Sequence, residues 1–248
     1  MIEVDHLTKR FDQHEVLHDI CAVFLPGRVN LIIGQSGAGK TVLLKSLVGL
    51  LSIDQGDIIY SDQSLKKMYP AHRKDLRKRI GMLFQGSALF DSMTVEENVL
   101  FPLDMFTSWS YEQKKERVDF CLKRVELPNA GPLYPSELSG GMKKRAAIAR
   151  AIAPNPDYLF CDEPNSGLDP MTSLVIDHLI QEITQEYNIT TVVNTHDMNS
   201  VMGIGEHITF LNRGRVAWTG SNKEIFHSGS QPLDEFIFAA PWTQQMKR

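Results

Sequence analysis

The chain has 248 residues, of which 42% are hydrophobic and 23% charged, and 26 basic against 30 acidic residues give a formal net charge of −4. This composition fits one large globular domain or two small lobes, and it argues against a polycation that binds nucleic acid. No window approaches the roughly 18 uninterrupted apolar residues of a membrane-spanning helix, and the N-terminus does not resemble a secretory signal, so we expect any membrane role to act through a partner.

The first part of the chain predicts a phosphate-binding loop between a strand and a helix. Strands are expected at Ile2–Val4, Val16–Ile20 and Val29–Ile33, and a helix over Val42–Leu51. Between the last strand and the helix, the sequence matches G-x-x-x-x-G-K-[ST], whose backbone N–H groups can surround a phosphate. The nucleotide-binding residues predicted here are Gly34, Gln35, Ser36, Gly37, Ala38, Gly39, Lys40, Thr41 and Val42. Lys40 would reach the β- and γ-phosphate oxygens and the Thr41 hydroxyl would hold Mg²⁺, whereas a chance glycine-rich turn is the alternative.

The rest of the chain predicts a parallel sheet interrupted by helices. A strand at Asp57–Tyr60, a basic helix at Ala71–Arg79 and an apolar strand at Ile80–Phe84 lead to Gln85. From Gly86 to about Pro154 the pattern is helical, with a capping box at Thr94–Glu97 and further helices at Tyr111–Val125 and Gly140–Ala153. Strands at Tyr158–Cys161 and Thr190–Asn194 then flank a helix at Met171–Tyr187. Strand, helix and strand of these lengths indicate an α/β lobe with a parallel sheet, into which an all-helical lobe is inserted.

Two carboxylates follow the apolar strand that ends at Cys161. Asp162 would lie at the carboxyl end of this strand, beside the phosphate-binding loop, where a phosphate-bound Mg²⁺ needs an acidic neighbour. Adjacent strand residues point to opposite sides, so Glu163 would instead face an attacking water as a general base. A solvated strand end is the alternative.

A second anion-binding segment is expected where the alanine-rich helix begins. Ser139, Gly140 and Gly141 offer a hydroxyl and bare amides at a helix N-terminus, and Lys143, Lys144 and Arg145 follow. One nucleotide cannot use both loops of a chain from the same side. We therefore expect a head-to-tail dimer with two composite sites, unless Ser139 is only an N-cap.

Several motifs in this order resemble the nucleotide-binding subunits of ABC transporters. They are Gly34–Thr41, Gln85, Leu138–Gly141, Asp162 with Glu163, Ser166–Asp169 and Thr195–Asp197. The resemblance implies a P-loop NTPase (RecA-like) α/β fold with an N-terminal antiparallel β part and an inserted helical lobe. Residues 1–225 would form the ATPase domain, with the nucleotide-binding lobe at 1–85 and 155–225 and the helical lobe at 86–154. Residues 226–248 would form a C-terminal extension.

The same resemblance implies an ATPase that converts ATP and water to ADP and phosphate, with Mg²⁺ as cofactor. The Phe11 ring would stack on adenine with Val16 beside it. Gln85 would touch Mg²⁺ and the water that Glu163 polarises. Asp169 would couple the two sites of the dimer, and His196 would contact the γ-phosphate. Taken alone, Phe11 would usually be a core residue and His196 a surface residue.

Three segments resemble the MlaF-like group of Mla/Mce-type phospholipid transporters. They are Met82–Gln85 with Ala88–Phe90, Thr94–Val99 with Pro102 and Leu103, and Glu137–Met142 with Arg145–Ala147. The last includes Met142 where the superfamily usually has glutamine, and Gly86-Ser87 departs from the pattern of the group. The resemblance implies a homodimer on the cytoplasmic face of the inner membrane, peripheral through a permease dimer and assembled with an MCE-domain lipid-binding protein. Nucleic acid is not an expected partner. Two alternatives remain: an FtsE-like mechanotransmission ATPase and a small-solute importer ATPase. A third rival is a DNA-repair or translation protein of the superfamily. Such proteins usually have two cassettes or long coiled-coil insertions, for which 248 residues are too few.

Other segments predict surfaces. A permease helix would dock on an apolar groove after Gln85, with Leu89 and Phe101 in the core and Phe90, Met105 and Phe106 exposed. Residues 232–248 would pack across the partner subunit, or else cover their own lobe. The basic run His72–Arg79 suggests nucleic acid or lipid headgroups, although solvation explains it more simply. The cysteines, Cys21, Cys121 and Cys161, are expected to be isolated buried thiols in a reducing compartment.

Overall fold

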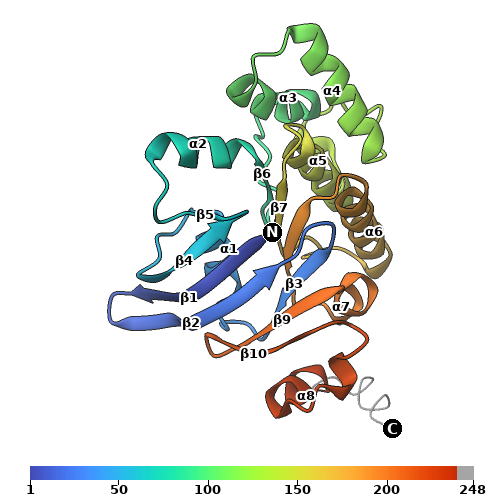
Figure 1. Cartoon of the computed structure of the whole chain (residues 1–248). Coiled ribbons are helices and arrows are strands. Elements are labelled where there is room, and N and C mark those ends of the chain that lie inside the picture. Colours follow the sequence, from blue (N-terminus) through green and yellow to red (C-terminus); the bar gives the residue numbers. More distant parts are fainter. Residues whose placement is uncertain (239–248) are drawn as a thin grey trace.

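The computed structural model describes residues 1–238, which form two sheets surrounded by helices (Figure 1). The smaller, antiparallel sheet has the order β2-β1-β4-β5, with strands β1 (Ile2–Phe11), β2 (His14–Phe24), β4 (Gln55–Tyr60) and β5 (Gln63–Ser64). The larger sheet has the order β10-β9-β3-β8-β7-β6, with strands β3 (Val29–Ile33), β6 (Ile80–Leu83), β7 (Tyr158–Asp162), β8 (Thr190–Asn194), β9 (His207–Asn212) and β10 (Arg215–Gly220). All its strands are parallel except β10, which pairs antiparallel with β9. The expected parallel sheet and N-terminal antiparallel part are both present.

The helices gather at one end of the sheets and along their faces. They are α1 (Lys40–Leu47), α2 (Pro70–Lys78), α3 (Val95–Phe106), α4 (Tyr111–Arg124), α5 (Gly140–Ile152), α6 (Pro170–Glu186), α7 (Met198–Ile204) and α8 (Gln231–Ile237), with 3₁₀ turns at Pro135–Glu137 and Ile225–His227. Figure 1 shows α3 and α4 at the top, next to α5, and α8 below β10. None of the helices in residues 1–238 is long and apolar enough to cross a membrane. The lobe boundaries at 85/86, 154/155 and 225/226 remain predictions.

Local signals set where the helices of this upper end begin. The capping box expected at the start of α3 is present: the Glu97 amide donates to Thr94 Oγ1 at 3.2 Å, and the Thr94 amide donates to Glu97 Oε2 at 2.7 Å. Ser110 and Gln113 form the same box at α4. Each box satisfies amides that the first helical turn leaves without partners.

The inner strands β3, β7 and β8 of the larger sheet are buried on both faces, which explains their mostly apolar runs. Leu31 and Ile33 of β3 pack with α5 and α6, whereas Ile32 packs with α1 and the antiparallel sheet. Helix α1 therefore lies between the two sheets, and β3 delivers the chain into α1 at the carboxyl edge of the parallel strands. This connection places the phosphate-binding loop where ligands bind in open α/β sheets.

Several expectations need correction. The sequence predicted no elements after Asp197, yet α7, β9, β10 and α8 lie there. Cys21 is exposed rather than buried, because a register shift in the β1–β2 pairing turns it outward, whereas Cys121 and Cys161 are buried. Leu89 and Phe101 are half-buried rather than fully in the core.

The described part of the C-terminal segment packs on its own subunit. Leu233 and Ile237 of α8 are buried in the larger core cluster, and the Phe236 ring lies 5.4 Å from that of Phe210 in β9. Up to residue 238, this segment covers its own sheet, which agrees with the alternative of the two expectations. Residues 239–248 lie outside the described residues.

Candidate nucleotide site

The phosphate-binding loop connects β3 to α1 and requires glycine at two tight positions. Gly34 has φ 150°, and a Cβ there would lie 2.3 Å from the Leu211 carbonyl oxygen. Gly39 has φ 100°, and a Cβ there would lie 2.7 Å from Leu17 Cδ2. Any side chain at either position would push the loop off β2 and β9, so the glycines let the loop lie close to the sheets.

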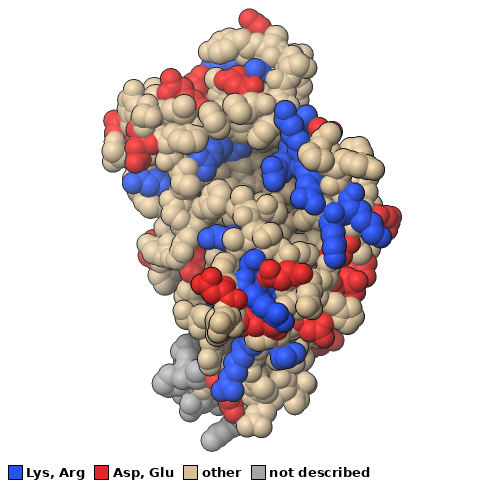
Figure 2. All heavy atoms as spheres, turned by 90° about the vertical axis from the view of Figure 1, so that its left-hand side faces the viewer, with Lys and Arg blue, Asp and Glu red and all other residues tan. Residues whose placement is uncertain are grey.

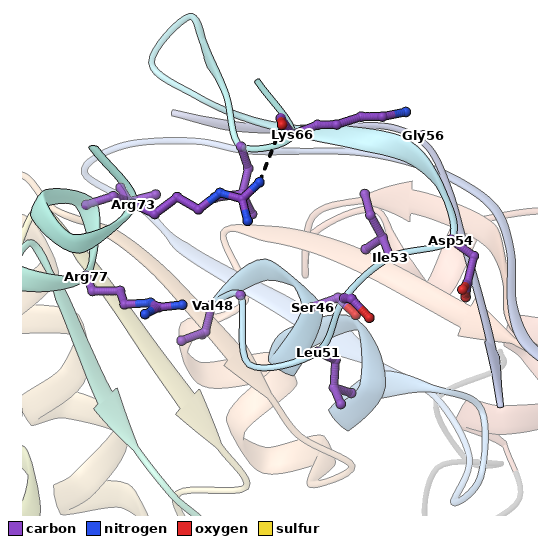
Figure 3. Close-up of a pocket in the computed structure, with 13 residues that line it drawn as sticks. Ser46, Val48, Leu51, Ile53, Asp54, Gly56, Lys66, Arg73 and Arg77 are labelled. Carbon is purple, nitrogen blue, oxygen red and sulfur yellow. Dashed lines mark hydrogen bonds between the residues drawn. The ribbon is translucent and has the colours of Figure 1, made fainter. Parts of the chain in front are cut away.

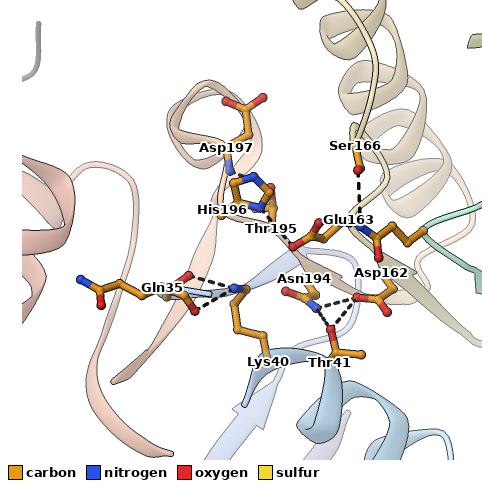
Figure 4. Close-up of polar contacts among 12 residues, drawn as sticks. Gln35, Lys40, Thr41, Asp162, Glu163, Ser166, Asn194, Thr195, His196 and Asp197 are labelled. Atoms are coloured by element: carbon orange, nitrogen blue, oxygen red, sulfur yellow. Dashed lines mark hydrogen bonds and ion pairs between the residues drawn. The ribbon is translucent and has the colours of Figure 1, made fainter. Parts of the chain in front are cut away.

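The Lys40 side chain lies inside the phosphate-binding loop. Its Nζ donates to the carbonyl oxygens of Gly34 at 2.9 Å and Gln35 at 3.2 Å, and the side chain is buried (Figure 4). Burial lowers the pKa of Lys40, and the nearby Glu163 and Asp162 carboxylates oppose this effect. When a phosphate enters the loop, the Lys40 ammonium would donate to its charged oxygens instead of to these neutral carbonyl oxygens.

Thr41, Asp162 and Asn194 form one polar cluster at the ends of β7 and β8 (Figure 4). Thr41 Oγ1 donates to Asp162 Oδ1 at 3.2 Å, and Asn194 Nδ2 donates to Asp162 Oδ1 at 2.6 Å and to Thr41 Oγ1 at 3.1 Å. Sequence reasoning missed Asn194. Asn194 reaches the cluster because it is the register partner of Asp162 on the neighbouring strand, a pairing that no local sequence signal gives.

This cluster fits a magnesium ion. Carboxylate, hydroxyl and amide oxygens are the ligands that Mg²⁺ takes in proteins. The Asn194 Oδ1 atom is buried and has no hydrogen-bond partner within the described part of the chain, so the cluster holds an unused acceptor.

Glu163 lies just after the end of β7 and contacts His196, whereas Asp162 contacts Thr41. The left-handed backbone of Glu163, and not the expected strand alternation, sets this direction. Its Oε1 lies 3.0 Å from His196 Nδ1, and its Oε2 accepts from Gln85 Nε2 at 3.2 Å (Figure 4). Its backbone has φ 47°, a costly conformation for a residue with a side chain, and such strain concentrates at functional sites. A cavity of about 460 Å³ opens here, lined among others by Glu163, Ser166 and His196. The structure thus brings Glu163, Gln85 and His196 together.

The serine-glycine segment is exposed at the start of α5. Ser139 is the N-cap, since its Oγ accepts from the Met142 amide at 3.3 Å, which is the simpler of the two readings. Within residues 1–238, no hydrogen bond joins Ser139, Gly140 or Gly141 to the phosphate-binding loop of the same chain.

Two of the basic residues after this segment, Lys144 and Arg145, donate hydrogen bonds to backbone carbonyl oxygens of the same chain. Lys144 is buried and donates to the Gln85 carbonyl oxygen, and burial lowers its pKa. Arg145 Nη1 donates to the carbonyl oxygens of Val125 and Glu126 at 3.3 and 3.1 Å. The expectation that Lys144 and Arg145 extend a phosphate-binding surface is therefore wrong. Lys144 instead fixes the backbone of Gln85.

The remaining predicted residues lie around this centre. Phe11 is 43% exposed at the end of β1, where the Lys9 ammonium lies 5.2 Å from its ring centroid, so it is not the core residue that an early strand would suggest. Val16 and Val42 are half-buried, in β2 and α1. Asp169 caps α6 by accepting from the Thr172 amide at 3.0 Å and the Thr172 hydroxyl at 2.5 Å, and these hydrogen bonds lower its pKa.

A buried polar cluster behind Glu163 was also missed. Asn165 Nδ2 donates to Asp177 Oδ1 at 2.8 Å and to Ser200 Oγ at 3.0 Å, which ties the loop after Glu163 to α6 and α7. Asp177 is 3% exposed, and burial raises its pKa to about 6, an effect that the hydrogen bonds from Ser200 and Asn165 reduce.

Comparison with known proteins agrees with this geometry. The profile of the ABC transporter family matches residues 17–166, and the chain belongs to that family. It is an ATP-binding subunit of an ABC transporter, and it is an ATPase of the ABC ATPase fold.

Its relatives have several transport roles. The methionine import ATP-binding protein MetN of Clostridium tetani (strain Massachusetts / E88) is 41% identical over 239 residues, covering 96% of this chain and 74% of the relative. The intermembrane phospholipid transport system ATP-binding protein MlaF of Haemophilus influenzae (strain ATCC 51907 / DSM 11121 / KW20 / Rd) is 35% identical over 237 residues, covering 96% and 90%. The dimeric structure of MJ0796, a bacterial ABC transporter cassette, has a TM-score of 0.82 at 30% identity, covering 90% and 99% of the two chains. The MlaF-like group is thus not singled out from the importers.

Proposed function

We propose that this chain is the ATPase of an Mla/Mce-type phospholipid transporter, acting on a permease dimer that carries an MCE-domain lipid-binding protein. The observation that carries the proposal is Met142, at the position where importer ATPases normally have glutamine. Its side chain is half-buried against the main core cluster, and its thioether cannot replace the hydrogen bonds of an amide. The MlaF relative supports the same assignment.

In this proposal, Glu163 is the general base for ATP hydrolysis. Its two oxygens are oriented by His196 and Gln85, so a water held at the carboxylate would lose its proton to Glu163. Lys40 and the loop amides would bind the phosphates. His196 would then leave its contact with Glu163 and contact the γ-phosphate instead. Thr41, Asp162 and Gln85 would hold Mg²⁺, with Asn194 orienting the first two. When bound, Mg²⁺ neutralises charge on the phosphate oxygens.

The exposed Ser139–Gly141 segment supports a head-to-tail homodimer. Its amides and hydroxyl would complete the nucleotide site of the partner, and Asp169 would lie near the junction of the two sites. The dimeric state of the MJ0796 cassette is consistent with this arrangement. The adenine would stack on the exposed Phe11 ring.

The permease would dock on apolar side chains that are exposed in α3 and in the segment before it. Met105 is 61% exposed, and Phe90 and Phe106 are 42% and 41% exposed. The Phe90 ring stands edge-on to Phe101, 5.0 Å between centroids, which fixes it at the surface. An amphipathic helix of the permease could cover these side chains.

Small-solute import is the second candidate, and the 41% identity to MetN favours it. FtsE-like mechanotransmission would use the same catalytic residues. To distinguish them, the tagged chain is purified in detergent from its own membranes, and co-purifying proteins and lipids are identified by mass spectrometry. A multi-pass permease with an MCE-domain protein and phospholipid supports the proposal. A solute-binding protein would make it an importer, and a partner with a large extracytoplasmic domain but no lipid would indicate mechanotransmission.

A further inference from the structure

A second cavity, of about 260 Å³, lies between the end of α1, the start of β4 and α2 (Figure 3). Its lining shares no residue with the nucleotide site described above. The apolar part of the wall is formed by Val48, Leu51, Ile53, Leu65 and Leu76. The polar part includes Ser46, Asp54, Lys66, Arg73 and Arg77. The cavity is therefore apolar on one side and strongly basic on the other.

The basic residues of this cavity lack counter-charges. Arg73 and Arg77, one turn apart on α2, extend toward the cavity in Figure 3. Neither they nor Lys66 form an ion pair with any described residue, and the one hydrogen bond of Arg73 runs from Nη2 to the Lys66 carbonyl oxygen at 3.4 Å. Like charges one turn apart destabilise a helix, so two unpaired guanidinium groups at this spacing indicate a place for an anion.

The acidic residue of the lining does not neutralise these cations. The Asp54 carboxylate accepts from the Arg10 amide at 2.6 Å, and the Lys9 Nζ lies 3.4 Å from the same oxygen. These contacts, which lower the pKa of Asp54, engage it with the β1 strand. Figure 2 shows Lys and Arg side chains over much of the side where α2 lies, with Asp and Glu side chains among them. Near the cavity, the three cations of the lining outnumber its one carboxylate.

Ser46 also lines the cavity, but it offers no group to a ligand. It is fully buried in α1, and its hydroxyl, which has no hydrogen-bond partner within residues 1–238, has no accessible surface. A ligand oxygen in the cavity therefore cannot reach it, and the basic side chains are the groups that can bind an anion.

We propose that this cavity binds the phosphate group of an amphipathic phosphate ester. Arg73 and Arg77 would hold the phosphate oxygens, since guanidinium groups match phosphate geometry, and Lys66 would add a third cation. The apolar wall would cover the hydrocarbon next to the phosphate. The ligand is either a lipid headgroup or a soluble phosphate ester, which share this chemistry. The site does not depend on which substrate the transporter moves.

The test is calorimetric titration of the full chain with two probes, dihexanoyl phosphatidic acid and glycerol 3-phosphate. Saturating Mg²⁺ and ADP keep the nucleotide site occupied. Arg73→Gln with Arg77→Gln should weaken binding by about tenfold or more, because both charged hydrogen-bond donors are lost. Lys74→Gln with Lys78→Gln is the matched control: it removes the same charge from the same helix, but neither lysine lines the cavity. The control should change the affinity by less than about twofold.

Ser46→Ala is a second control. Because the hydroxyl makes no hydrogen bond with any residue of 1–238 and has no accessible surface, alanine should leave the thermal stability unchanged or higher and should change the affinity by less than about twofold. Binding of the lipid analogue alone assigns a headgroup, and equal binding of glycerol 3-phosphate assigns a soluble ester. Equal losses in the arginine and lysine variants would overturn the proposal. The proposal would also be overturned if neither probe bound. The basic side chains of the cavity would then be a site for an acidic side chain of a protein partner. Neither result bears on the transported substrate.

Discussion

Replacing Asp177 by asparagine should stabilise the protein at neutral pH. Asp177 is a buried carboxylate whose hydrogen bonds come from neutral groups, with Asn165 Nδ2 at 2.8 Å. Of the charged groups that act on it, Asp197 raises its pKa and His178 lowers it. Asparagine keeps an acceptor for Asn165, and its own amide can donate to Ser200 or to Asn165 Oδ1, which is buried without a partner. The substitution therefore removes a buried charge and keeps the hydrogen bonds.

The size of the effect follows from the pKa of this carboxyl. Burial raises it from 3.8 to about 6, so the folded protein holds the proton more tightly than the unfolded chain. The contribution of this proton to stability is fully present below pH 3.8 and is lost as the pH rises through about 6. At about 1.4 kcal/mol for each pH unit, the loss amounts to about 3 kcal/mol. Asparagine does not ionise, so the variant does not lose this free energy as the pH rises.

The assay is urea unfolding of wild type and Asp177→Asn between pH 4 and 8. The free energy of unfolding of the variant, relative to wild type, should rise by about 3 kcal/mol through the window from 3.8 to about 6 and then level off. Asp119→Asn, whose side chain is 62% exposed, is the control and should show no such rise. Parallel curves for wild type and Asp177→Asn, or a variant less stable at pH 7.5, would refute the reasoning.

Four further changes test the nucleotide site and the C-terminal helix. Glu163→Gln should lower ATP turnover by about 10²- to 10⁴-fold and let an ATP-bound dimer accumulate in gel filtration, whereas full turnover would mean that another group is the base. Lys40→Ala removes the charged donor inside the loop and should raise the Kd for ATP by about tenfold or more, measured by titration, and an unchanged Kd would contradict its assigned role. Asn194→Ala should raise the Mg²⁺ concentration for half-maximal ATPase activity by about 10- to 100-fold; the same Mg²⁺ dependence as wild type would remove Asn194 from the site. Leu233→Ala should lower the free energy of unfolding by about 2–5 kcal/mol without affecting ATP-driven dimerisation, and the reverse pattern would return α8 to the dimer interface.

Local sequence signals predicted those features that depend on local physics. The capping box at Thr94 fixes the start of α3 because the side chain and the amide that it satisfies are three residues apart. The strand that ends at Asp162 was recognisable from its apolar run, whereas the direction of Glu163 depends on a left-handed backbone that strand alternation does not predict. Among the elements missed after Asp197, α7 is only seven residues long and gives little helical periodicity. The apolar run of β9 and the alternation of β10 were usable strand signals that were overlooked. A helix as short as α7 is stable only because it packs on the larger sheet.

The sequence by itself determined the order of most strands and helices up to Asp197, the phosphate-binding loop and the residue types expected around the γ-phosphate. Only the tertiary structure decided which of them meet. Asn194 joins the Thr41–Asp162 pair because β7 and β8 are parallel neighbours in register, a choice made by sheet packing between residues far apart in the chain. Lys144 and Arg145 look like anion ligands in sequence, yet burial directs them to backbone carbonyl oxygens. Burial and register are properties of the whole fold, since they depend on segments that no local pattern connects.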